Sequence, residues 1–228
     1  MILIFNHGSG QEFYPDECYP SQQTAPGGVP PVIGGLAGVE VKNKRILLYV
    51  LCSSEWVGEY RHASQTGEAK VVKRAREIAR VIKRFHEAGV PPARIFLSGQ
   101  SAGAWASLLV ARDHREQFNA LIGFAPAFAG QRVTREYGWE QLRQRQRAFV
   151  AEAPQLNALI FAVEGDAYES PDELRFLQKI PGVTLVELQP SAVDGARCES
   201  GTAHSLAYRG CFLTQRERIL RFIEERLP

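Results

Sequence analysis

The sequence lacks the features that would place a protein in a membrane or on nucleic acid. No apolar run approaches the roughly 18 residues that a transmembrane helix needs. No basic leader precedes the first apolar run, although a chain trimmed at its start would look the same. The 27 Lys and Arg residues are nearly balanced by 25 Asp and Glu, which gives a formal net charge of +2. We therefore expect no membrane span and no nucleic-acid partner.

Cysteine is scarce, and its spacing excludes the common zinc motifs. The four cysteines, Cys18, Cys52, Cys198 and Cys211, form no CxxC pair, so we expect no metal site. An even count in predicted loops fits disulfides: Cys198 and Cys211 bracket His204, and neighbouring strands would bring Cys18 and Cys52 close. Four reduced thiols in a cytosolic enzyme are the alternative. The placement favours a secreted or periplasmic location over a cytoplasmic one.

Internal repeats, low-complexity tracts and interdomain linkers are also missing. The chain is 45% apolar and 23% charged, as expected of a globular protein. Its length suits one domain with a sizeable core. We expect a single domain spanning residues 1–228.

Short, continuously apolar runs are what the sequence has in quantity. Such runs are typical of parallel strands covered on both faces. Helical patterns lie between them, and this alternation predicts an α/β fold with a mainly parallel sheet. The predicted strands are 2–5, 46–51, 95–98, 120–125, 158–163 and 183–188, and the predicted helices are 66–88, 102–113, 136–151, 171–177 and 214–226.

Three segments carry more specific expectations. The helix at 66–88 has one apolar stripe, and Arg74 is among the basic residues that we expect to face water. The helix at 136–151 is amphipathic, with Arg and Gln residues opposite its apolar side. It predicts a covering helix, with a lid as the alternative. Segment 9–44 is rich in Pro and Gly and predicts a long loop beside a site, with at most one short helix near 32–37.

The segment 99–103, Gly-Gln-Ser-Ala-Gly, follows one predicted strand and opens the next predicted helix. A serine turned sharply between strand and helix adopts strained backbone angles and needs small neighbours on both sides. A glycine-rich turn without chemistry is the alternative interpretation. The position between strand and helix favours Ser101 as a nucleophile.

A serine hydroxyl needs a base that takes its proton during attack. His204 lies after the last predicted strand and before the last predicted helix, whereas His86 and His114 belong to helix ends far from the strand tips. We expect His204 to be the general base. A loop histidine bonded to the backbone is the alternative.

The acid that orients the imidazole is expected just past the carboxyl end of a strand, where catalytic groups gather in parallel sheets. Asp166 has this position after the run at 158–163 and is the first choice. Glu164 and Glu169 are substitutes, and Asp194 is a weaker one.

The segment 6–10, Asn-His-Gly-Ser-Gly, follows the first predicted strand. Two backbone N–H groups aimed at the developing oxyanion stabilise an acyl-transfer transition state. We expect one from Ala102 and the other from Ser9, with Gly10 as the alternative donor. His7 is then a structural residue. A plain glycine turn is the alternative for the whole segment.

Taken together, these motifs resemble the α/β-hydrolase superfamily over nearly the whole chain, and within it small esterases of the dienelactone-hydrolase and polyester-depolymerase types. The resemblance implies a three-layer sandwich with a mostly parallel sheet of about six strands, because the first two family strands are missing. It also implies that Ser101, Asp166 and His204 form the triad and that Ala102 and Ser9 form the oxyanion hole. The family often spaces Gly and the acid as GxxD, whereas Gly165 and Asp166 are adjacent here.

The function implied is that of a serine hydrolase, with a carboxylesterase as the leading interpretation. Its substrate would be a small-molecule or polymeric ester, cleaved through an acyl-serine intermediate with no metal or organic cofactor. An amidase or peptidase with the same triad is one alternative, and a non-catalytic binding protein on a hydrolase scaffold is the other. The sequence leaves the oligomeric state open.

Overall fold

Six parallel strands form the central sheet of the computed structural model, which describes residues 1–8, 28–51, 70–190, 198 and 203–228. The strand order is β4-β1-β5-β6-β7-β8, and every neighbouring pair is parallel. The predicted sheet of about six mostly parallel strands is confirmed. The strands are β1 (Ile2–Asn6), β4 (Leu47–Leu51), β5 (Ile95–Gln100), β6 (Ala120–Phe124), β7 (Ala158–Val163) and β8 (Val183–Leu188).

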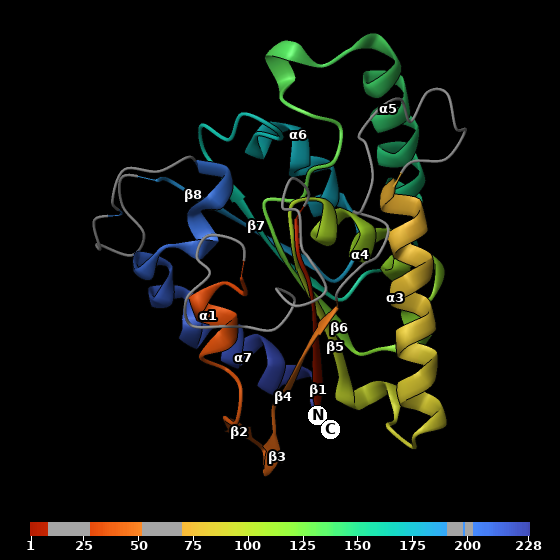
Figure 1. Cartoon of the computed structure of the whole chain (residues 1–228), viewed down its shortest axis with the longest axis vertical. Helices are drawn as coiled ribbons and strands as arrows, with labels where there is room; N and C mark the ends of the chain where they lie inside the picture. Colours follow the sequence, from red (N-terminus) through yellow and green to blue (C-terminus); the bar gives the residue numbers. More distant parts are fainter. Residues whose placement is uncertain (9–27, 52–69, 191–197, 199–202) are drawn as a thin grey trace.

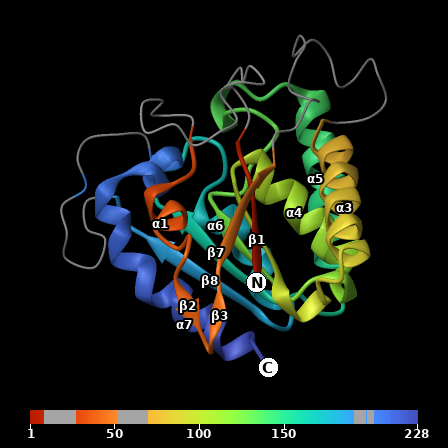
Figure 2. The same cartoon turned by 60° about the horizontal axis from the view of Figure 1, so that its bottom comes forward.

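Helices cover both faces of this sheet and give three layers (Figure 1). One face carries α3 (Lys70–Glu87), α4 (Ala102–Asp113) and α5 (Tyr137–Ala151), and the other carries α1 (Pro31–Gly34) and α7 (Arg216–Arg226). The same separation is visible after a turn of the molecule (Figure 2). The three-layer α/β sandwich expected from the sequence is therefore present.

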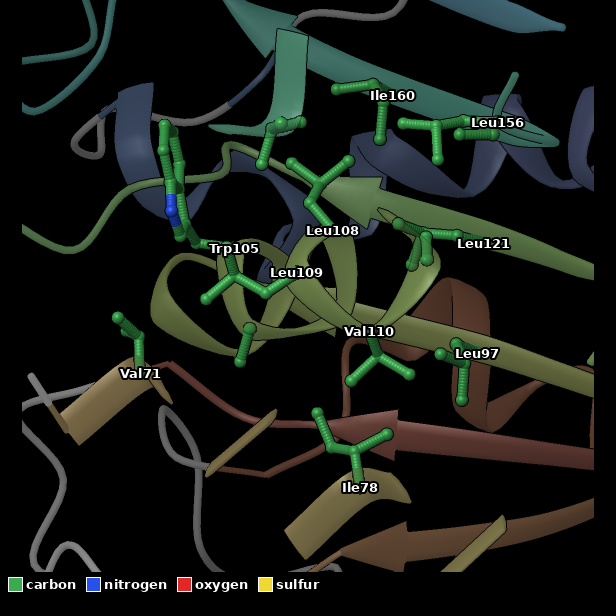
Figure 3. Packing of buried hydrophobic residues seen from close by; sticks show 14 of the residues in the cluster. Val71, Ile78, Leu97, Trp105, Leu108, Leu109, Val110, Leu121, Leu156 and Ile160 are labelled. Atoms are coloured by element: carbon green, nitrogen blue, oxygen red, sulfur yellow. The ribbon is translucent and has the colours of Figure 1, made fainter. Parts of the chain in front are cut away.

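Two hydrophobic clusters fill the spaces between sheet and helices. Successive strand residues point to opposite faces, so Ile4 belongs to one cluster while Leu3 and Phe5 belong to the other. Helix α4 lies deepest, with every residue from Ala102 to Ala111 buried. Figure 3 shows side chains of α4 packed between those of α3 and those of the strands. The labelled residues are Val71, Ile78, Leu97, Trp105, Leu108, Leu109, Val110, Leu121, Leu156 and Ile160.

The structure corrects the expected exposure of Arg74. This residue of α3 was expected to face water, but it is 1% exposed and its guanidinium donates to the backbone oxygen of His7. Helix α5 also buries two polar residues, Arg143 and Gln146. Gln146 Oε1 accepts a hydrogen bond of 2.8 Å from the indole of Trp105 on α4. Arg74 and Gln146 thus have partners far away in the sequence, and an amphipathic pattern does not reveal such partners.

Several element boundaries also differ from those expected. A small hairpin of β2 (Glu40–Val41) and β3 (Lys44–Arg45) occurs where only one short helix was predicted. The helix expected at 171–177 ends at Leu174 as α6 (Pro171–Leu174) and continues as a 3₁₀-helix (Arg175–Lys179). The one expected at 214–226 begins at Arg216, because its first turns are a 3₁₀-helix (Gly210–Gln215). Helix ends often tighten in this way.

The ends of the chain lie at the amino edge of the sheet, beside the hairpin (Figure 1). The terminal ammonium group donates to the carbonyl oxygen of Arg45 at 2.8 Å, and the Lys42 ammonium donates to that of Leu227 at 2.7 Å. The carboxyl ends of all six strands lie at the opposite edge. Among the described helices, none combines the length and apolarity of a bilayer span.

Candidate active site

Ser101 lies in a strained turn between β5 and α4. Its φ of 52° and ψ of −123° are rare for a residue with a side chain. A Cβ added to Gly103 would lie 2.1 Å from the carbonyl oxygen of Asn6, and one added to Gly99 would lie 2.6 Å from the backbone of Gly103. Both glycines are therefore required by the close approach of α4 to the strands β1 and β5.

Hydrogen bonds hold the strained turn in place. The Ser101 N–H donates to the carbonyl oxygen of Phe124 at 2.9 Å, and the Ser101 carbonyl accepts from the N–H groups of Trp105 and Ala127 at 3.0 and 3.3 Å. Strand β6 and the start of α4 thus fix the backbone on both sides of the serine. Its hydroxyl is presented at the carboxyl edge of the sheet.

Three predicted site residues meet at this edge. The distance from Ser101 Oγ to His204 Nε2 is 2.8 Å, and that from His204 Nδ1 to Asp166 Oδ2 is also 2.8 Å. They come from the turn after β5, the loop after β7 and the 3₁₀-helix (Ala203–Tyr208) that follows β8. Asp166 is fully buried, whereas the His204 side chain is 13% exposed. A buried carboxylate, an imidazole and a serine hydroxyl form one hydrogen-bonded chain.

A left-handed glycine directs Asp166 toward the imidazole. Gly165 has a φ of 77°, and the N–H of Asp166 turns back to the carbonyl oxygen of Val163 at 3.2 Å. The adjacency of Gly165 and Asp166, which departs from the GxxD spacing, therefore builds a tight turn at the strand end.

The other candidate acids have different surroundings. Glu164 is exposed. Glu169 is fully buried, but its carboxylate accepts from Arg143 Nε at 2.6 Å and from Arg135 Nη2 at 3.2 Å. Asp194 lies outside the described residues. Of the described candidates, the carboxylate bonded to His204 belongs to Asp166.

Sequence reasoning missed two residues that contact His204. The Gln100 side chain donates to the carbonyl oxygen of His204 at 3.0 Å. The ring of Tyr168 lies with its centroid 4.1 Å from that of the His204 ring. Gln100 occupies the first of the two unspecified positions in the GxSxG pattern of residues 99–103, and Tyr168 follows Asp166 by two residues. No sequence motif marked either position.

The predicted oxyanion donors are described only in part. Ala102 is the first residue of α4, and the first N–H groups of a helix have no partner within it. Ser9 and Gly10 lie outside the described residues. Gly8 packs closely against the turn that holds Ser101. A Cβ added to Gly8 would lie 2.2 Å from Gln100 Oε1 and 3.1 Å from Ser101 Cβ.

His7 is buried beside the charge of Arg74. Burial and, to a smaller extent, the charge of Arg74 lower the pKa of His7 to about 3, against the opposing hydrogen bond to Gly8. Its Nδ1 lies 2.7 Å from the Gly8 carbonyl oxygen and its Nε2 lies 3.1 Å from Arg74 Nη2. A neutral ring with its proton on Nδ1 satisfies both contacts, so His7 holds the turn that leads to Ser9.

A disulfide closes the segment that carries His204. Cys198 and Cys211 are bonded and lie 13 residues apart in sequence. The expected pairing of these two cysteines is therefore present, while Cys18 and Cys52 lie outside the described residues. Among the residues that are described, no group of three His, Cys, Asp or Glu side chains is arranged to hold a metal ion.

Solved structures match this chain, whereas no protein-family model and no curated sequence does. A monoacylglycerol lipase from Paleococcus ferrophilus gives a TM-score of 0.65 at 13% identity, covering 99% of this chain and 94% of that chain. A propionate-bound esterase from Thermogutta terrifontis gives 0.57 at 20% identity, covering 98% and 82%. A yden-like hydrolase from Pectobacterium atrosepticum gives 0.56 at 16% identity, covering 99% and 92%.

The chain has an α/β-hydrolase fold. In such folds the chain order of the triad is serine, then acid, then histidine, and the serine lies in a strained strand–helix elbow. Ser101, Asp166 and His204 follow this order. Three features of this fold position these residues. The turn between β5 and α4 holds Ser101, the Gly165 turn holds Asp166, and the segment closed by the Cys198–Cys211 disulfide carries His204.

Proposed function

We propose that the protein is a serine hydrolase that cleaves a carboxylic ester through an acyl intermediate on Ser101. The observation that carries this proposal is the continuous hydrogen-bonded chain from Ser101 through His204 to Asp166, with both distances at 2.8 Å. We also propose that residues 1–228 work as one domain, since α1 and α7, from opposite ends of the chain, cover the same sheet face.

Acylation begins at the Ser101 hydroxyl. His204 Nε2 takes the hydroxyl proton as Oγ forms a bond to the ester carbonyl carbon, and the carbonyl oxygen becomes an oxyanion. The N–H groups of Ala102 and Ser9 donate to that oxygen. Asp166 holds Nδ1 and stabilises the imidazolium. The tetrahedral intermediate then expels the alcohol, which receives its proton from His204.

Deacylation repeats these roles with water. His204 removes a proton from a water molecule, whose oxygen attacks the acyl carbon, and Ser101 leaves with the proton from the imidazolium. The acid is released and the enzyme returns to its starting state. Every proton moves between the substrate, water, Ser101 and His204, so the sequence of steps needs no cofactor.

Similar proteins support an ester as the substrate class. Two of the neighbours that share the fold are described as an esterase and a lipase, and the Thermogutta terrifontis esterase is also known phosphonylated by sarin. Such a reagent suits an activated serine hydroxyl. A small-molecule or polymeric ester fits the same chemistry.

The test is covalent labelling of the serine together with hydrolysis of p-nitrophenyl acetate. We expect a fluorophosphonate to label wild-type protein on Ser101, and Ser101→Ala to lose labelling and at least about 1,000-fold in kcat. Ser107→Ala is the matched control, because Ser107 lies on the same helix and its hydroxyl donates to the Gly103 carbonyl oxygen. Labelling that persists in Ser101→Ala, or a wild-type protein that neither reacts nor hydrolyses esters, would contradict the proposal.

A further inference from the structure

An aromatic ring covers the imidazole of His204. The Tyr168 and His204 ring centroids are 4.1 Å apart, and the two planes are inclined by 31°. A separation this short at a shallow angle places the face of the phenol ring against the imidazole. Tyr168 is half-buried and is not part of the bonded chain from Ser101 to Asp166.

The backbone of Tyr168 is held at both of its polar groups. Its N–H donates to Asp166 Oδ1 at 2.8 Å, and its carbonyl oxygen accepts from Arg135 Nη2 at 2.7 Å. The same carboxylate therefore binds His204 through one oxygen and Tyr168 through the other. Because Asp166 is fully buried, this arrangement couples the position of the phenol ring to that of the imidazole.

Two arginines of a neighbouring segment bind this loop. Arg132 donates to the carbonyl oxygen of Asp166 at 2.8 Å, and the Arg135 side chain is only 4% exposed. Both arginines bind backbone oxygens of this loop, Arg132 that of Asp166 and Arg135 that of Tyr168. In the part of the chain that the structure describes, the charged group bonded to the imidazole itself is Asp166.

We propose that Tyr168 is a positioning residue that stabilises the imidazolium form of His204 during catalysis. This inference rests on the proposed serine-hydrolase function. The face of an aromatic ring carries negative potential, and a cation within about 6 Å of its centroid is attracted to it. In the proposed mechanism His204 gains a positive charge as it takes a proton from Ser101 or from water. The contact is therefore stronger in the transition state than in the ground state and acts on the rate of the chemical step.

Two substitutions separate the ring from its hydroxyl group. Tyr168→Phe keeps the aromatic face, whereas Tyr168→Leu keeps an apolar side chain without it. With p-nitrophenyl acetate we expect Tyr168→Leu to lower kcat about fivefold, the effect of one ordinary cation–π contact. KM should stay within about twofold, and Tyr168→Phe should restore the wild-type rate. The rate constant for fluorophosphonate labelling of Ser101 should follow the same order, with thermal melting measured for each protein.

Three results would overturn the inference: a wild-type rate in Tyr168→Leu, an equal loss of rate in Tyr168→Phe, or a loss that appears in KM alone. A drop in melting temperature that Tyr168→Phe shares with Tyr168→Leu, without recovery of rate, would also count against it. A wild-type protein that does not react with the fluorophosphonate would instead defeat the proposed function, and this inference with it. The two failures are therefore distinguishable.

Discussion

At the scale of single residues, His7 is a neutral imidazole buried beside a guanidinium. Its pKa falls from 6.5 to about 3, chiefly because burial disfavours the cation and also because Arg74 repels it. In the unfolded chain the ring takes up a proton near pH 6.5, and in the folded chain it does so only near pH 3. Protonation therefore favours the unfolded state as the pH falls from about 6.5 toward 3, and the effect is absent above 6.5.

This difference predicts a pH dependence that His7→Asn reduces. Between pH 7 and pH 5 we expect His7 to account for about 2 kcal/mol of lost unfolding free energy. An asparagine amide can replace the Nδ1–H donor to Gly8 without titrating. Urea unfolding of both proteins at the two pH values measures the difference. Equal losses of stability in the two proteins would show that His7 is not the group responsible.

At the scale of elements, α5 is tied to the loop after β7 by a buried ion pair. Glu169 accepts from Arg143 and Arg135, and the three side chains are 4% exposed or less. Loss of one partner from a buried pair costs far more than loss of a surface pair. Without Glu169, the two arginines would keep only the more exposed carboxylates of Glu140 and Glu173. The same loop carries Asp166, so this ion pair stabilises the loop that holds the carboxylate bonded to His204.

We expect Glu169→Gln to lower the free energy of unfolding by about 3 kcal/mol. Glu187→Gln is the matched control: Glu187 also binds an arginine, Arg175 at 2.8 Å, but that pair is exposed. Its loss should cost less than about 1 kcal/mol. Urea unfolding at pH 7 measures both changes. Similar costs for the two variants would mean that the Glu169 pair is not the stabilising contact that its burial indicates.

The sequence predicts elements better than it predicts which faces of them are polar. Continuous apolar runs located all six strands of the sheet, because parallel strands are buried on both faces. The burial of Arg143 could not be foreseen, since its partner Glu169 lies 26 residues further along, in the loop after β7. Arg74 was expected to face water for the same reason, since its partner His7 lies 67 residues earlier in the chain. A helical pattern of apolar residues predicts that a polar residue is exposed unless its distant partner is known.

At the scale of the whole molecule, the parallel sheet explains how much of the site could be anticipated. Residues that follow the carboxyl ends of β5, β7 and β8 must share one edge, so Ser101, Asp166 and His204 could be placed together from sequence alone. The choice of Asp166 over Glu169 depends on the Gly165 turn and on two arginines, Arg143 of α5 and Arg135 just before it. Gln100 and Tyr168 could not be found, because their contacts depend on how the loops fold at that edge.

The Cys198–Cys211 disulfide predicts that reduction affects both stability and reactivity. The disulfide joins two cysteines 13 residues apart, with His204 between them. A disulfide that closes a loop of similar size raises the free energy of unfolding by about 3 kcal/mol. We expect the double variant Cys198→Ala/Cys211→Ala to lose about that much and to react more slowly with a fluorophosphonate. Urea unfolding and labelling rates measure the two effects.

A chain in which this bond persists suits an oxidising compartment. A thiol count by mass spectrometry under denaturing conditions would check whether Cys198 and Cys211 are paired in the purified protein. Full alkylation of both cysteines without reductant, or a double variant as stable and as reactive as wild type, would contradict the role given to this bond.

Both ends of the chain are bound by the β2–β3 hairpin, at the edge of the sheet opposite Ser101, Asp166 and His204. A fusion partner or a solid support attached to either end would therefore lie far from Ser101. The same geometry suits circular permutation: a short peptide would join the ends, and new ends would open in a surface loop without disturbing the turn that holds Ser101.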